Sequence, residues 1–75
     1  MKLPSKITSY KESVLSKIPY ILNILQNSDT DILLLYKSNE NYFNNIEEFI
    51  DTLDCLFALK KIIYDEEREV LCYAV

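Results

Sequence analysis

NNIEEFIDTLDCLFALKK, the stretch from Asn44 to Lys61, is the segment whose pattern most clearly predicts a helix, and the rest of the chain is interpreted around it. The segment after it, IIYDEEREVLCYAV, has two apolar runs on either side of a charged turn, which is the pattern of a β-hairpin. The strand candidates are Ile62–Tyr64 and Glu69–Val75, joined by a turn at Asp65–Arg68. Both faces of the second strand are apolar, so we expect it either to be buried on both sides or to expose an apolar face to which another protein can bind.

The predicted helix has two chemically different sides. At about 100° per residue, six apolar residues cover an arc of roughly 120°: Ile46, Phe49, Ile50, Leu53, Leu56 and Phe57. We expect this arc to face the core. The opposite arc, which we expect to face solvent, carries four acids: Glu47, Glu48, Asp51 and Asp54. Near the end of the helix the apolar and acidic sides are no longer separate, because Cys55, Ala58 and Leu59 lie on the acidic side. We expect either the hairpin or another chain to cover these three residues.

A helix interrupted by a proline is expected near the start of the chain. Apolar residues recur at helical spacing from Val14 to Leu25, and Pro19 lies among them. The helix therefore either kinks at Pro19 or begins near Ser16 with Pro19 in its first turn, and we favour a helix over residues 16–26. Because Pro4 disfavours a helical conformation in the residue before it, residues 1–8 are expected to form an extended N-terminal arm.

A second helix is expected in the middle of the chain. The apolar run Ile32–Tyr36 fits a short buried helix or a buried strand, and periodicity alone does not separate the two. Its leucines and the acids before it favour a helix, with Ser28 as its N-cap and Asp29 and Asp31 in its first turn. The polar run Lys37–Asn41 is expected to be a loop.

The two ends of the third helix depend on local backbone chemistry. Asn44 or Asn45 fits the N-cap, and Glu47 or Glu48 fits the matching position of a capping box. The chain contains no glycine, so neither the helix end nor the hairpin turn has the residue that most easily adopts a positive φ. Either an asparagine or a lysine adopts that conformation, or the turns avoid it.

This order of elements predicts an α+β fold, a small winged-helix-like domain of three helices followed by a C-terminal β-hairpin and spanning residues 1–75. The last helix of a winged helix often reads DNA, but a fold does not fix a function. The function has to be argued from the side chains.

Composition disfavours several functional classes. Without histidine or a CxxC pair, the chain is expected to hold no metal and no other cofactor, and its paired carboxylates fit a solvated helix face better than an active site. We therefore expect no enzyme. No signal-peptide pattern is visible, and no apolar stretch approaches the roughly 20 residues that span a bilayer. A cytoplasmic protein with Cys55 and Cys72 reduced is expected.

Charge disfavours direct nucleic-acid binding. The net charge is −4, whereas affinity for nucleic acid comes largely from Lys and Arg. The turn DEER is acidic where a DNA-contacting wing needs bases, and the only donors near the helix start, Asn44 and Asn45, are expected to be occupied in capping. A DNA-binding regulator or antitoxin, with the hairpin as a candidate dimer contact, is the alternative function. It would rely on a basic N-terminal segment that contains Lys2, Lys6, Lys11 and Lys17.

Several stretches also resemble a known family. They are LPSKI at residues 3–7, SVL at 13–15, YILNIL at 20–25 and FIDTLDCLFALKKI at 49–62. In these stretches the chain resembles middle component 6 of the ABC-three-component systems, small bacterial proteins encoded beside an ABC-type ATPase in predicted conflict and defence loci. The chain departs from the pattern at Lys60, where the family tends to have glycine, and at Pro19, where it often has a small residue.

The resemblance implies a non-catalytic adaptor that links an ABC or SMC-like ATPase to a third component of an antiphage system, with no membrane partner. Protein contacts are expected through the acidic helix face and the hairpin, and a second copy of the chain is a further candidate partner. The residues expected to contact a partner are Glu47, Glu48, Asp51, Asp54, Tyr64, Leu71 and Tyr73.

Overall fold

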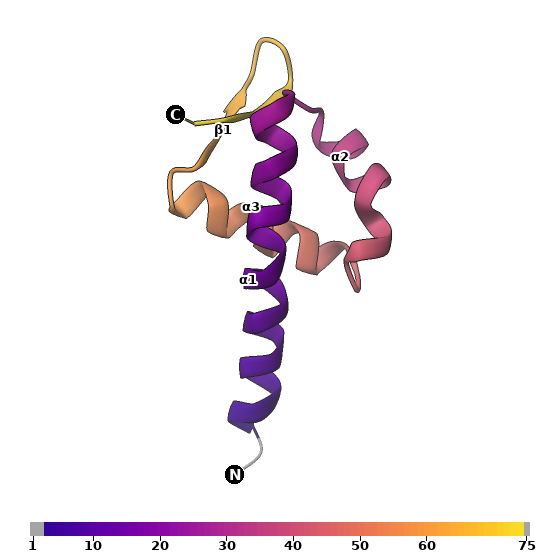
Figure 1. Cartoon of the computed structure of the whole chain (residues 1–75), viewed down its shortest axis with the longest axis vertical. Coiled ribbons are helices and arrows are strands. Elements are labelled where there is room, and N and C mark those ends of the chain that lie inside the picture. Colours follow the sequence, from indigo (N-terminus) through magenta and orange to yellow (C-terminus); the bar gives the residue numbers. More distant parts are fainter. Residues whose placement is uncertain (1–2, 75) are drawn as a thin grey trace.

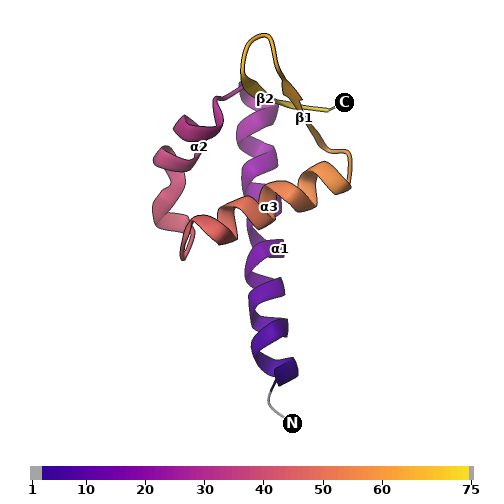
Figure 2. The same cartoon turned by 180° about the vertical axis from the view of Figure 1, so that it is seen from behind.

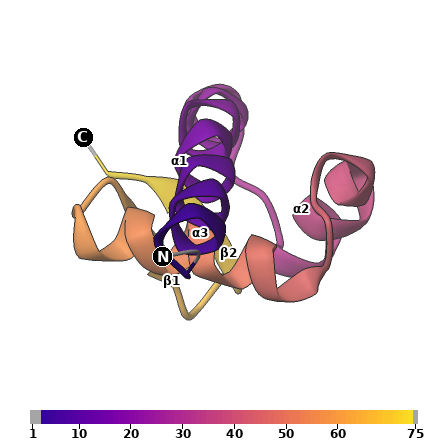
Figure 3. The ribbon, with the colours of Figure 1, turned by 90° about the horizontal axis from the view of Figure 1, so that it is seen from below.

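The computed structural model describes the backbone of residues 3–74 and the side chains of residues 9–74. Figures 1 and 2 show a long first helix, α1 (Leu3–Asn27), which a later helix, α3 (Ile46–Ala58), crosses part-way along, and a hairpin at the C-terminal end of α1. Seen along α1, helix α2 (Ile32–Asn39) lies to one side of it, and α3 passes beneath (Figure 3). The N-terminal turns of α1 therefore extend beyond the rest of the fold.

Helix α1 (Leu3–Asn27) is much longer than the sequence predicts. The expected extended arm is wrong for residues 3–8, which are helical, while Met1 and Lys2 lie outside the described residues. Pro4 is compatible with this start because it occupies the first turn, where backbone N–H groups have no partner within the helix.

The expected helix start near Ser16 is also wrong, because α1 begins at Leu3 and Pro19 lies in its interior and not in its first turn. Proline removes one backbone donor, which leaves the carbonyl of Leu15 without its usual partner. Pro19 and Leu15 are both exposed, so water has access to this side of the helix. Proline at a solvated position therefore interrupts the hydrogen bonds of α1 without ending it.

Helix α2 (Ile32–Asn39) resolves the helix-or-strand alternative in favour of a helix. Its N-cap is Asp31, whose side chain accepts a hydrogen bond from the backbone N–H of Leu34, so the prediction of Ser28 was wrong. The predicted loop at 37–41 was also wrong. The Ser38 hydroxyl donates to the Leu34 carbonyl, the helix continues, and a 3-10 turn, η1 (Glu40–Tyr42), follows it.

The N-cap of helix α3 (Ile46–Ala58) is Asn45, whose side chain accepts a hydrogen bond from the N–H of Glu48. Of the two predicted N-caps, Asn44 and Asn45, the second is therefore confirmed. It ends in a Schellman motif, in which the N–H of Lys60 donates to the Phe57 carbonyl and that of Lys61 to the Leu56 carbonyl, both at 3.0 Å. Lys60 has a φ of 60°, so a lysine takes the left-handed position usually held by glycine.

The hairpin consists of β1 (Ile62–Asp65) and β2 (Val70–Tyr73), in an antiparallel register that pairs Ile62 with Tyr73. Both predicted strands are confirmed, although β2 is shorter than predicted and Val75 is outside the described residues. Glu69 adopts a φ of 56° at the end of the turn, which the sequence did not indicate. Thr30 pairs with the other edge of β2, which ties the hairpin to the segment between α1 and α2.

All three helices and both strands contribute to one core. Its buried residues are Ile21, Leu25, Leu35, Phe43, Phe49, Leu53, Leu56, Ile62 and Leu71. The predicted α+β class, with three helices followed by a C-terminal hairpin, is confirmed; the winged-helix likeness stays a prediction. Among the described residues, no helix combines the length and apolarity needed to cross a bilayer.

Candidate protein-binding surface

Helix α3 is rotated about its axis relative to the orientation that its sequence predicts. The side chains it buries are Glu48, Phe49, Thr52, Leu53 and Leu56. Three residues of the predicted core arc are instead exposed, Ile46 by 53%, Ile50 by 43% and Phe57 by 39%. On a helical projection at about 100° per residue, the buried arc lies roughly 70° from the centre of the apolar arc. The prediction that this arc faces the core was therefore wrong for half of its members.

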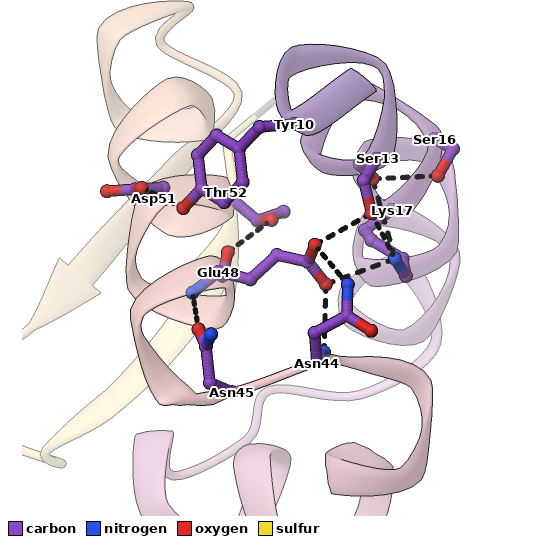
Figure 4. Close-up of polar contacts among 9 residues, drawn as sticks. All are labelled: Tyr10, Ser13, Ser16, Lys17, Asn44, Asn45, Glu48, Asp51 and Thr52. Atoms are coloured by element: carbon purple, nitrogen blue, oxygen red, sulfur yellow. Dashed lines mark hydrogen bonds and ion pairs between the residues drawn. The ribbon is translucent and has the colours of Figure 1, made fainter. Parts of the chain in front are cut away.

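A buried carboxylate explains the rotation (Figure 4). Glu48 is 0% exposed, and its carboxylate accepts hydrogen bonds from the Ser13 hydroxyl at 2.7 Å and the Lys17 ammonium at 3.2 Å, both on α1. It accepts two more from Asn44, from the backbone N–H at 3.1 Å and from the side-chain amide at 3.0 Å. Because four donors converge on one carboxylate, turning α3 to bury Ile50 would break contacts with two separate segments.

These donors also set the ionisation of Glu48. Burial is the largest single influence and favours the neutral acid, but the hydrogen bonds from Ser13, Asn44 and Lys17 together outweigh it. The pKa of Glu48 consequently lies below its ordinary value, and the carboxylate is charged at neutral pH. The expectation that Glu48 faces solvent was wrong, because the sequence does not show that Ser13, Lys17 and Asn44 meet it.

A second polar contact joins α1 to α3 on the other side of Glu48. The phenol of Tyr10 donates a hydrogen bond to the Asp51 carboxylate (Figure 4). This bond, helped by desolvation and by the neighbouring acids, raises the pKa of Tyr10 to about 12. Asp51 is therefore engaged within the chain.

An open groove of about 450 Å³ lies beside this contact, between α1 and α3. Its lining residues are Tyr10, Lys11, Val14, Leu15, Asp51, Asp54 and Cys55. Asp54 therefore borders the groove on one side and the exposed apolar residues of α3 on the other. Cys55 is half-buried and is not joined to Cys72.

The outward surface of α3 combines an apolar stripe with an acidic edge. We call Ile46, Ile50 and Phe57 the α3 stripe, since all three lie within roughly 40° of one another around the helix. Glu47 and Asp54, both exposed, follow along one edge of it. The other edge turns into the core at Leu53 and Phe49. Exposed apolar side chains beside polar ones are typical of protein-binding surfaces.

The seven residues predicted to contact a partner differ in their exposure, and one of them, Asp51, accepts the hydrogen bond from Tyr10 described above. Glu47 and Asp54 lie on the acidic edge, and Tyr64 is 42% exposed on β1. Tyr73 is half-buried, whereas Glu48 and Leu71 are fully buried and offer no surface to a partner. The α3 stripe was missed because apolar residues at helical spacing were assigned to the core.

Other kinds of site find less support in the described residues. No group of three or more cysteine, aspartate or glutamate side chains is arranged to hold a metal ion among residues 9–74. Asn45 caps α3 and Asn44 binds Glu48, so the amides that would have to read DNA bases are engaged.

Comparison with known proteins identifies the family. The family model of ABC-three component (ABC-3C) system Middle Component 7 matches residues 3–71, which is most of the chain. The resemblance described above named component 6, so it was right about the middle components and wrong about the member. Neither the curated proteins nor the solved structures contain a significant match to the chain. The chain belongs to the ABC-three component (ABC-3C) system Middle Component 7 family.

Proposed function

We propose that this chain is a non-catalytic adaptor subunit that bridges the ABC-type ATPase and another component of a cytoplasmic bacterial antiphage defence system. Membership of the middle-component family supports a role among protein partners. The α3 stripe supplies a surface on which one of those partners can bind. The fold provides this surface on a rigid helix, because α3 is capped at both ends and its rotation is held by Glu48.

The exposure of Ile46, Ile50 and Phe57 is the observation that carries the proposal. A chain this small buries only a modest core, and leaving three apolar residues exposed on one helix face forgoes stabilisation of about 1 kcal/mol or more for each. The acidic edge beside them disfavours a nucleic-acid backbone. An apolar surface of this kind is better explained by a protein that covers it than by the stability of the isolated chain.

Co-purification tests the proposal. The tagged chain is expressed with the ATPase and the third component of its own system, and both are expected to be retained with the wild-type protein. Ile50→Asp places a charge in the middle of the α3 stripe and should abolish retention of one of them. Leu33→Asp is the matched control, since Leu33 is a 65% exposed apolar residue of another helix, α2, and does not belong to the stripe.

Two results would overturn this account. If the wild-type chain retains neither component, the adaptor function is wrong. If Ile50→Asp retains both components as well as Leu33→Asp does, the function stands but the α3 stripe is not its surface. A salt-sensitive complex of the wild-type chain with duplex DNA would favour the alternative regulator function instead.

A further inference from the structure

We propose that the segment seated on the α3 stripe is an amphipathic helix of a partner subunit, with basic residues along one edge, and not a second copy of this chain. This inference rests on the proposed function and names the chemistry of the partner at the same surface. It follows from the spacing of the apolar side chains and from the distribution of charge around them.

The spacing of the stripe fits a helix. Ile46, Ile50, Leu53 and Phe57 follow one another at intervals of four, three and four residues, the repeat along which two helices pack side by side. Leu53 belongs to the core and is 4% exposed, so it lies along the core-side edge of the stripe, at a level of the helix between Ile50 and Phe57. The repeat covers three turns, or roughly 16 Å of helix, which is long enough to seat two to three turns of a partner helix.

The charge of the stripe is one-sided. Glu47 and Asp54 are seven residues apart and thus lie on the same edge, two turns from each other. On α3 itself no basic residue follows Asn44 until Lys60, which is beyond its end, and the neighbouring Lys11 of α1 lines the groove on the far side of Asp54 from the stripe. A helix lying on the stripe therefore has one edge against two carboxylates, and Lys or Arg residues spaced seven apart on that edge would pair with both.

The same charges disfavour pairing between two copies through this surface. A two-fold arrangement brings the same surface of each copy together, so an antiparallel α3 pair would place Glu47 of one copy near Asp54 of the other. A parallel two-fold pair would place the acidic edge of each copy against the opposite edge of the other, where Phe49 turns into the core. The antiparallel arrangement therefore brings like charges together across an apolar contact, where they are costly, and the parallel arrangement leaves the carboxylates without a basic partner.

Cross-linking and charge reversal test the inference. A photoreactive benzoyl group on Phe57, in the chain co-purified with the ATPase and the third component, should label one segment of one of these proteins. That segment is expected to have apolar residues at intervals of three and four and basic residues seven apart. Glu47→Lys with Asp54→Lys should weaken retention of the labelled component about tenfold. Glu66→Lys with Glu67→Lys changes the net charge equally within the exposed hairpin turn and should leave retention unchanged.

The outcomes separate this inference from the proposed function. If Ile50→Asp abolishes retention but the α3 charge reversal does not, the adaptor function stands and the basic-edged helix is wrong. Labelling of a strand, of an acidic segment or of a second copy of the chain would also overturn the inference. If the wild-type chain retains no component, the proposed function fails first. Retention that falls equally with both double reversals would show an effect of net charge alone and would contradict the inference.

Discussion

Replacing Glu48 with alanine should destabilise the fold more than any change to the exposed acids of α3. The substitution leaves four donors without their acceptor: the Ser13 hydroxyl, the Lys17 ammonium and two N–H groups of Asn44. Removing one partner of a buried ion pair costs about 3–5 kcal/mol. The Lys17 side chain is 18% exposed and can regain some water, so we expect about 3 kcal/mol, at the lower end of that range. The free energy of unfolding of so small a domain is only about 4–11 kcal/mol in total.

Urea unfolding followed by far-ultraviolet circular dichroism measures this loss, with Glu47→Ala as the matched control. Glu47 is the exposed neighbour of Glu48 in the first turn of α3, and its removal should cost only about 0.5 kcal/mol. The midpoint should fall sharply for Glu48→Ala and little for Glu47→Ala, with similar denaturant slopes. Equal, small losses in the two variants would refute the claim that the Glu48 contacts fix the rotation of α3.

The effect of Glu48 should also depend on pH in a defined direction. Because the folded chain lowers the pKa of Glu48, the unfolded chain binds the proton more tightly, and acid shifts the equilibrium toward unfolding. The stabilisation from Glu48 is thus fully present above the unfolded pKa of about 4.3 and is lost as pH falls through the lower folded pKa. The difference between the wild-type chain and Glu48→Ala should be constant near neutral pH and shrink below about pH 4.

Three further substitutions test local features of the fold. Lys60→Gly should stabilise the chain by about 1 kcal/mol in the same urea assay, because glycine adopts the positive φ at this helix end without steric cost, and a loss of stability would contradict the Schellman geometry. Asn45→Ala should cost about 1 kcal/mol through loss of the N-cap, and no change would mean that α3 starts elsewhere. Tyr10→Phe removes the phenol hydroxyl that donates to Asp51, so the absorbance titration of the tyrosines should lose the ionisation step near pH 12. If the substitution instead removes a step near pH 10, the value of an ordinary tyrosine, the contact with Asp51 is refuted.

The sequence predicted the elements whose signals are local. The periodicity of residues 46–57 indicated α3, and two apolar runs around a charged turn indicated the hairpin. At the end of α3 the lack of glycine left two possibilities, an asparagine or lysine with a positive φ or a turn that avoids this conformation, and Lys60 adopts the positive φ. Local signals failed where two candidates competed, as at the N-cap of α2, where Asp31 and not Ser28 accepts the hydrogen bond.

The candidate site could not be predicted in the same way, because it depends on contacts between distant segments. The sequence shows which side of a helix is apolar, but the side that is buried also depends on where the buried polar groups find hydrogen-bond partners. Ser13 and Lys17 lie 35 and 31 residues from Glu48, and nothing in their types marks them as its partners. The same dependence on distant contacts applies to α1, whose middle part is joined to α3 at Tyr10, Ser13 and Lys17 by hydrogen bonds that span 41, 35 and 31 residues of sequence.

Hydroxyl-radical footprinting, with and without the ATPase and the third component, tests the central claim most directly. In the isolated chain, Phe57, Ile46 and Ile50 should be labelled readily, while Phe49, which is 1% exposed, should be protected. On assembly, labelling of the three stripe residues should fall several-fold. In the complex with the one component whose retention Ile50→Asp abolishes, labelling of Leu33 on α2 should stay unchanged. Stripe residues labelled equally in the isolated and the assembled chain would contradict the assignment of the α3 stripe as the surface that the partner covers.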